Sequence, residues 1–247
     1  MPKDLFSTQA TTYSRYRPGY PPELIEFILS FTNGRTRAWD CATGNGQAAT
    51  LLAPHFEEVM ATDWSTQQIA QAVACPAIRY SVSAAESTAF PDDYFDLITI
   101  AQAYHWLPFA AFHREATRVG RQGAIVAAWG YNLVQSANPQ FNRLIREFYE
   151  SLREYWDPER RYVEESYRTV SFAFDPLPAR EFISEVHWAI DDLLGFFRSW
   201  SSVQNYRNSR GDDPVDPYIE KWQSIWNEEA IHEFFFPIFL RIGKVTK

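Results

Sequence analysis

The chain has 247 residues and a formal net charge of −8, and it contains two cysteines and five histidines. This length suits one large domain or one domain with a cap. Because no run rich in Lys and Arg is present to neutralise phosphates, the composition disfavours a broad nucleic-acid surface.

The sequence shows no sign of a membrane segment, a disulfide framework or a metal site. No stretch of about 18 continuous apolar residues occurs, and the N-terminal segment lacks the apolar region of a secretion signal. The two cysteines fall in the predicted core, and the histidines lack the spacing of metal ligands. We therefore expect a cytoplasmic protein with no membrane, no nucleic-acid partner and no bound metal.

The first 34 residues are predicted to form an N-terminal lid followed by a helix. Polar and aromatic residues fill the segment 6–20, and Pro21-Pro22 then begins a helix, because proline suits the first helical turn. Asn33-Gly34 supplies the stop at its C-terminal end. This helix should pack across an edge of the sheet.

The stretch 36–63 has the pattern of a nucleoside-binding strand-helix-strand unit. A short apolar strand ends at Cys41, and the turn 43–46 contains two glycines that allow close backbone approach. The turn opens directly into a helix N-terminus. A second strand ends at Asp63, about 20 residues after the turn, where a carboxylate can accept both hydroxyls of a ribose. The sequence therefore predicts a nucleoside ligand.

The glycines alone leave two cofactor classes open. Gly44 to Ala49 fits the dinucleotide pattern G-x-G-x-x-A, which would indicate an NAD-linked oxidoreductase. Asp40 lies at the very end of the first strand, where it would repel a pyrophosphate but would suit a cationic amine. A nucleoside that carries an amino acid satisfies both Asp40 and Asp63.

The run from Asp40 to Gly46, followed by Asp63, resembles the cofactor loop of class I S-adenosylmethionine-dependent methyltransferases. The resemblance implies S-adenosylmethionine as the cofactor, in contact with Asp40, Ala42, Gly44, Gly46 and Asp63. That family usually has glycine where this chain has Ala42. We therefore expect φ to stay negative at Ala42, with a loop slightly less close to the methionine part of the cofactor.

Two further segments resemble small-molecule members of this family. Residues 85–96 have the spacing A-E-x-x-x-F-P-D-x-x-F-D of the segment that wraps adenine. This implies adenine contacts from the backbone near Ala85 and Glu86 and a stacking role for Trp64. The segment 13–21 resembles the N-terminal lid of the trans-aconitate methyltransferase group, which implies that Tyr16 or Arg17 faces the carboxylate of the cofactor.

A reaction centre is expected just after residue 101. Residues 97–101 form a continuous apolar strand, as in the middle of a parallel sheet. Gln102-Ala103-Tyr104-His105-Trp106 follows at its carboxyl end, where open α/β sheets bind their ligands. The form Q-A-x-H-W resembles the same small-molecule group and implies a cofactor contact for Gln102. His105 is the candidate catalytic base for a phenol or amine, whereas a carboxylate acceptor would need no base.

The acceptor pocket is expected to have aromatic walls and few cations, which suits a small molecule. The aromatic candidates for substrate binding are Tyr13, Tyr104, Trp106, Trp200 and Tyr206. An acceptor carboxylate could be held by Arg17, Arg207 or Arg210.

The fold class predicted is α/β: a Rossmann-like doubly wound seven-stranded sheet, mostly parallel with an antiparallel last strand, plus a helical cap. The cap is expected because four prolines interrupt the strand-helix alternation after residue 132. A helix is predicted over 191–203 and a last strand over 234–245. Within a single methyltransferase domain, 1–247, we expect a lid and helix in 1–34, a cofactor-binding core in 35–131, a cap insertion in 132–181, and strands and helices that complete the sheet in 182–247.

The function predicted is transfer of a methyl group from S-adenosylmethionine to a small-molecule acceptor, on the oxygen of a carboxylate or hydroxyl, by a monomer or homodimer. Methyl transfer from a sulfonium is an in-line displacement, so catalysis can come mainly from holding the nucleophile in a dry pocket. Two alternatives remain open. One is an S-adenosylmethionine-binding protein without transferase activity, and the other is the NAD-linked oxidoreductase.

Overall fold

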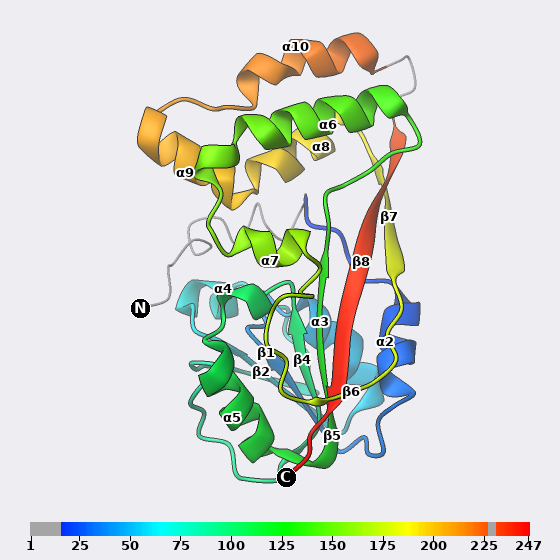
Figure 1. Cartoon of the computed structure of the whole chain (residues 1–247), viewed down its shortest axis with the longest axis vertical. Coiled ribbons are helices and arrows are strands. Elements are labelled where there is room, and N and C mark those ends of the chain that lie inside the picture. Colours follow the sequence, from blue (N-terminus) through cyan, green and yellow to red (C-terminus); the bar gives the residue numbers. More distant parts are fainter. Residues whose placement is uncertain (1–15, 227–230) are drawn as a thin grey trace.

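The computed structural model describes residues 16–226 and 231–247. Its core is a sheet of five parallel strands in the order β3-β2-β1-β4-β5, followed by an antiparallel β8 (Figure 1). The parallel strands are β1 (Arg37–Cys41), β2 (Glu58–Asp63), β3 (Ile78–Val82), β4 (Phe95–Ala101) and β5 (Gly120–Tyr131). The predicted mostly parallel sheet with an antiparallel last strand is confirmed.

Helices cover both faces of this sheet, which explains the apolar runs of its central strands. One face packs against α2 (Pro22–Leu29) and α3 (Gln47–Leu52), and the other against α5 (Phe109–Val119). In β4 every residue except the last is buried. Parallel strands buried on both faces need such uninterrupted apolar sequence, and their carboxyl ends then form a shared edge where loops can build a site. The short α4 (Thr66–Ala70) follows β2 at that edge.

The last strand, β8 (His232–Lys244), is thirteen residues long and belongs to two pairings. Its C-terminal half is antiparallel to β5, and its N-terminal half is antiparallel to β7 (Phe182–Trp188). Ile238 pairs with both Tyr131 and Phe182, at the point where one pairing gives way to the other. The two-residue β6 (Asp175–Pro176) also pairs with the C-terminal end of β8, so the sheet has eight strands among the described residues.

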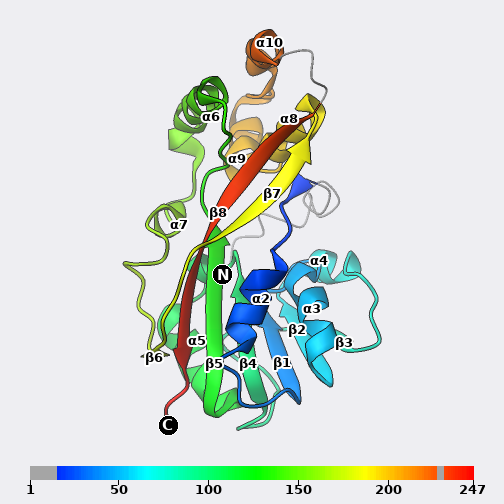
Figure 2. The same ribbon diagram turned by 90° about the vertical axis from the view of Figure 1, so that its right-hand side faces the viewer.

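A group of helices surrounds the N-terminal half of β8, beyond the end of the parallel sheet (Figures 1 and 2). It contains α6 (Pro139–Ser151), α8 (Ile190–Arg198), α9 (Ser201–Arg210) and α10 (Asp216–Ile225), and α7 (Arg160–Glu164) lies between this group and the sheet. We call these five helices the cap. Three of them come from the part of the chain after residue 182, so the cap is not confined to the segment 132–181.

The helix predicted over 191–203 is wrong in its extent. Trp200 has extended backbone dihedrals, φ −73° and ψ 140°, so α8 ends at Arg198 and α9 begins at Ser201. The Trp200 side chain is buried, with its ring 4.9 Å from that of Phe197 and 5.6 Å from that of Phe148. Burial of this large side chain against α6 and α8 favours a break that local helix propensity does not predict.

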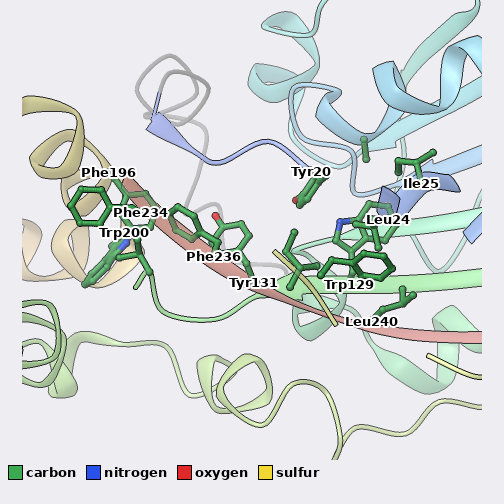
Figure 3. Packing of buried hydrophobic residues seen from close by; sticks show 14 of the residues in the cluster. Tyr20, Leu24, Ile25, Trp129, Tyr131, Phe196, Trp200, Phe234, Phe236 and Leu240 are labelled. Atoms are coloured by element: carbon green, nitrogen blue, oxygen red, sulfur yellow. The ribbon is translucent and has the colours of Figure 1, made fainter. Parts of the chain in front are cut away.

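The cap and the parallel sheet share one continuous apolar cluster (Figure 3). It runs along β8, with the ring of Phe236 5.2 Å from that of Phe196 in the cap and 5.3 Å from that of Tyr131 at the end of β5. On the sheet side Trp129 contacts Tyr20, with ring centroids 5.4 Å apart. Because these aromatic contacts are edge-to-face and buried, they fix the position of the cap above the carboxyl edge of the strands.

Candidate active site

Two adjoining cavities lie at the carboxyl edge of the parallel strands. The outer cavity has a volume of about 290 Å³ and lies over the loop after β1 and the end of β2. The inner cavity, of about 50 Å³, lies between the sheet and the cap. Gln102 and Trp106 line both cavities and therefore lie at the boundary between them, which we call the passage. This is the edge of an open α/β sheet where ligands bind.

The loop after β1 has a left-handed backbone at three positions: φ is +54° at Ala42, +57° at Gly44 and +91° at Gly46. At Gly46 a β-carbon would also lie 2.3 Å from the hydroxyl of Tyr80, so only glycine fits there. The expectation of a negative φ at Ala42 is wrong. A backbone hydrogen bond of 2.9 Å from Thr43 to Thr62 holds the loop against β2, so Ala42 carries backbone strain that glycine would avoid.

Asp63 connects this loop to the end of β2. One of its oxygens accepts a hydrogen bond of 2.9 Å from the amide of Gly44, and the other accepts one of 2.8 Å from the amide of Ser65. An ionised carboxylate offers about four acceptor positions, so it can hold the loop and still accept ribose hydroxyls. Asp63 lines the outer cavity beside Trp64, whose side chain is 46% exposed although it is large and apolar.

Asp40 lies beneath the loop and does not line either cavity. It is fully buried, and its two oxygens accept hydrogen bonds from the hydroxyls of Thr43 and Thr99. Burial raises the pKa of Asp40 to about 6, although both hydroxyl donors act in the opposite direction. The structure thus gives Asp40 a role in shaping the loop, and a cationic amine above the loop would interact with it through space.

Ala85, Glu86 and Gln102 form part of the remaining wall of the outer cavity. Ala84 and Ser87 form an isolated β-bridge that folds the segment carrying Ala85 and Glu86 over the cavity. Gln102 has φ +53°, and its side-chain oxygen accepts a hydrogen bond of 2.7 Å from the amide of Tyr131. Gln102 is therefore fixed to the end of β5, and its body separates the two cavities.

The inner cavity contains His105, which follows β4 in a 3-10 turn, η3 (Tyr104–Trp106). Its Nδ1 lies 2.9 Å from the hydroxyl of the buried Tyr167. Burial lowers the pKa of His105 to about 3, and the positive charge of Arg160 lowers it further. His105 is therefore neutral at pH 7 and a weak base, so it fits a hydrogen-bonding role better than proton abstraction.

Arg17 lies in the inner cavity rather than beside the loop, contrary to the expected contact with the carboxylate of the cofactor. Its guanidinium donates to the hydroxyl of Tyr131 (2.6 Å) and to the carbonyl of Ser199 (2.9 Å). It therefore connects the end of β5 to the cap. Tyr16 packs into the space left by Gly195 in α8, where a β-carbon would lie 2.6 Å from the tyrosine ring, and it lines neither cavity.

Several predicted acceptor contacts are not at the cavities. Tyr104 is fully buried, with its hydroxyl 2.6 Å from Nε2 of His113, so it belongs to the core. Tyr206 lies against Tyr155 on the side of the cap. Arg207 is paired with Asp213, and Arg210 donates to the hydroxyl of Tyr155 (2.9 Å). Tyr13 lies outside the described residues. Trp106 and Trp200 do line the inner cavity.

The inner cavity also has a lining residue of clear chemical interest that the sequence did not single out, Arg160 of α7. It stands in a charged segment beside Arg161, and charge alone does not distinguish the two arginines. The signal that could have separated them is the nearby Trp156, since arginine often stacks on tryptophan. Of the described residues, no three His, Cys, Asp or Glu side chains are grouped as metal ligands would be.

The residues that line the outer cavity have the chemistry that S-adenosylmethionine requires. The loop backbone at Gly44 is open, since a β-carbon there would meet only Gln68, at 3.8 Å. Asp63 offers acceptors for a ribose, and Trp64 offers an exposed ring for a base. Ala42, Gly44 and Gln102 line the same cavity.

Comparisons with known proteins show that the chain is similar to methyltransferases over nearly its whole length. A family model for the methyltransferase domain matches residues 39–128. A solved structure described as a type II methyltransferase from Anaeromyxobacter dehalogenans is 35% identical, covers 94% of this chain and 99% of its own, and superposes with a TM-score of 0.85. A Dictyostelium discoideum protein named as a methyltransferase is 28% identical over 98% of this chain and 95% of its own length.

The substitution Ala42→Gly should stabilise the protein. An alanine in the left-handed conformation destabilises the folded protein by about 1–2 kcal/mol. Glycine removes this strain, but its greater freedom in the unfolded chain offsets about 0.4–1 kcal/mol of the gain. We expect the free energy of unfolding in urea to rise by about 0.5–1 kcal/mol. The control is Ala103→Gly, since Ala103 has φ −130° and should gain nothing. An unchanged or lower stability of A42G would contradict the strain at this position.

Asp40 should make the stability of the protein depend on pH in an unusual direction. Its pKa in the folded state, about 6, is higher than the usual value of 3.8, so the folded protein keeps a proton that the unfolded chain has released. This contribution is complete below pH 4 and disappears as the pH rises through 6. Relative to Asp40→Asn, the parent protein should lose up to about 3 kcal/mol of unfolding free energy between pH 4 and 7. Urea unfolding of both proteins across this range measures the difference, and a constant difference would refute the raised pKa.

Proposed function

Since the chain belongs to the S-adenosylmethionine-dependent methyltransferases, we propose that it methylates a small-molecule acceptor on oxygen, with the cofactor in the outer cavity and the acceptor in the inner one. The observation that carries this proposal is the junction of the two cavities at Gln102 and Trp106. The cofactor supplies an electrophilic methyl group on a sulfonium. The protein has only to hold an acceptor oxygen opposite that methyl group and exclude water.

On the cofactor side we assign the roles by the position of each side chain. Asp63 accepts the ribose hydroxyls, Trp64 stacks on the adenine, and the backbone at Ala85 and Glu86 borders the adenine edge. The glycine loop approaches the methionine part, with Asp40 beneath it as the negative charge that favours the ammonium group. These assignments follow from the outer cavity, which these residues line or support.

On the acceptor side the weak basicity of His105 favours a carboxylate over a phenol or an alcohol. A general base works best when its pKa is near the working pH, and a pKa of about 3 is far below it. A carboxylate is already ionised at pH 7 and needs no proton removed. We therefore propose carboxylate oxygen as the methylated atom and a hydrogen-bonding role for His105.

No helix in the part of the chain that the structure describes is long and apolar enough to cross a bilayer. We also propose a cytoplasmic location, a monomeric or homodimeric state, and a division of the chain into lid, cofactor core and cap.

Calorimetric titration followed by mass spectrometry of an acceptor library tests the function. We expect S-adenosylmethionine and S-adenosylhomocysteine to bind and NAD not to bind, and we expect O-methyl products from carboxylic acids. Cofactor binding with no methylated product from any acceptor would favour a binding protein without transferase activity. Products methylated only on nitrogen would contradict the proposal that the methylated atom of the acceptor is oxygen.

The substitution Asp63→Ala should weaken cofactor binding about a hundred- to ten-thousand-fold. It removes two charge-assisted hydrogen bonds to the ribose, each worth about 1.5–3 kcal/mol, and 1.4 kcal/mol corresponds to about a factor of ten. Glu57→Ala is the matched control, because Glu57 is exposed just before the other end of β2. Calorimetry gives both affinities, and the melting temperature of D63A shows whether the fold is kept. If D63A is folded and binds the cofactor as tightly as the parent protein, the ribose hydroxyls do not contact Asp63.

A further inference from the structure

We propose that the inner cavity binds an anionic group of the acceptor through Arg160, and that this group is separate from the oxygen that is methylated. This inference rests on the proposed function and names the acceptor class: a molecule with two acidic groups, such as a dicarboxylic acid. One group would contact Arg160, and the other would reach the passage at Gln102 and Trp106.

Among the described residues, Arg160 is held by aromatic rings and a hydroxyl group and has no carboxylate partner. Its guanidinium carbon lies 4.9 Å from the ring centroid of Trp156 and 5.6 Å from that of Tyr149, and its Nε donates to the hydroxyl of Tyr149 at 3.2 Å. Its two terminal nitrogens form no hydrogen bond or ion pair with any residue in 16–226 or 231–247. A stacked guanidinium with both terminal nitrogens available is already ordered for a bidentate contact with a carboxylate.

The charges around the inner cavity favour an anion. Arg17 and Arg160 both line it, and the acid in its lining, Asp157, is buried with an oxygen 3.3 Å from the side-chain amide of Asn205. The positive charge of Arg160 also acts on His105. Burial lowers the pKa of His105, and this charge lowers it further. An acidic group that entered here would meet a net positive surrounding that little water can screen.

The size of the inner cavity explains why the anchored group is small. Its volume of about 50 Å³ is only a few times the space of about 10–15 Å³ that one water molecule needs in a cavity. A carboxylate fits such a space, whereas a large ring system does not. The rest of the acceptor must therefore extend toward Gln102 and Trp106, where the outer cavity begins.

The position of Arg160 separates the anchored group from the reacting oxygen. Arg160 lines only the inner cavity, whereas transfer must take place where the two cavities meet. A carboxylate that accepts hydrogen bonds from a guanidinium also has less electron density to attack a methyl group. In the step itself, an oxygen of the second acidic group forms a bond to the methyl carbon while the carbon–sulfur bond breaks. The sulfonium becomes a neutral thioether, and the acceptor becomes an ester with one negative charge fewer.

The test compares binding of paired acids and amides to the complex with S-adenosylhomocysteine, so that it does not depend on turnover. The probes are succinic, glutaric and phthalic acids and their diamides, titrated into the parent protein, Arg160→Gln and Arg160→Lys. The control is Arg161→Gln, because Arg161 is the neighbouring arginine and lies over Tyr162 at the surface.

We expect at least one diacid to bind the parent protein about ten- to a hundred-fold more tightly than its diamide, as for a charge-assisted pair. R160Q should lose this preference, R160K should keep part of it, and R161Q should keep all of it, with cofactor affinity unchanged in every variant. The inference is overturned if no diacid is preferred over its diamide, or if R160Q keeps the preference. A diacid that binds through Arg160 but gives no methyl ester with S-adenosylmethionine would instead refute the proposed function.

Discussion

The position of the outer cavity relative to the inner cavity depends on one strand, β8. β8 is long enough to pair with β5 along one half and with β7 along the other, so a single continuous backbone carries both the edge of the parallel sheet and the support of the cap. The buried aromatic residues along β8 join the two parts into one apolar cluster. Because the cap is fixed in this way, α7 and the start of α9 lie over the carboxyl edge, and the inner cavity adjoins the cofactor cavity.

The two cavities differ in the sign of their electrostatic surroundings. Burial raises the pKa of the Cys41 thiol beneath the cofactor loop, and the carboxylates of Asp40, Asp63 and Glu86 raise it further. In the inner cavity, burial lowers the pKa of His105, and Arg160 lowers it further. S-adenosylmethionine carries a sulfonium and an ammonium group, so it suits the acidic side, and an anionic acceptor suits the cationic side. Under the proposed function, this separation of charge would direct each ligand to its own cavity.

The sequence predicted what depends on neighbours along the chain. The glycine turn, the offset of Asp63 and the apolar strand before Gln102 are local patterns, and each lies where it was expected. The face that a side chain takes in a short turn was not predictable: Tyr104 and His105 are adjacent, yet one enters the core and the other the inner cavity. Arg160 and Tyr167 reach the site only through the tertiary position of the cap. The positive φ of Ala42 also depends on contacts with β2 that no local propensity reveals.

A crystal structure of the complex with S-adenosylhomocysteine and a bound diacid tests the central claim most directly. We expect the ribose on Asp63, the adenine against Trp64, the thioether sulfur facing the passage at Gln102 and Trp106, and one carboxylate of the diacid on Arg160. A sulfur that faces away from this passage, or a homocysteine chain that itself fills the inner cavity, would contradict this arrangement.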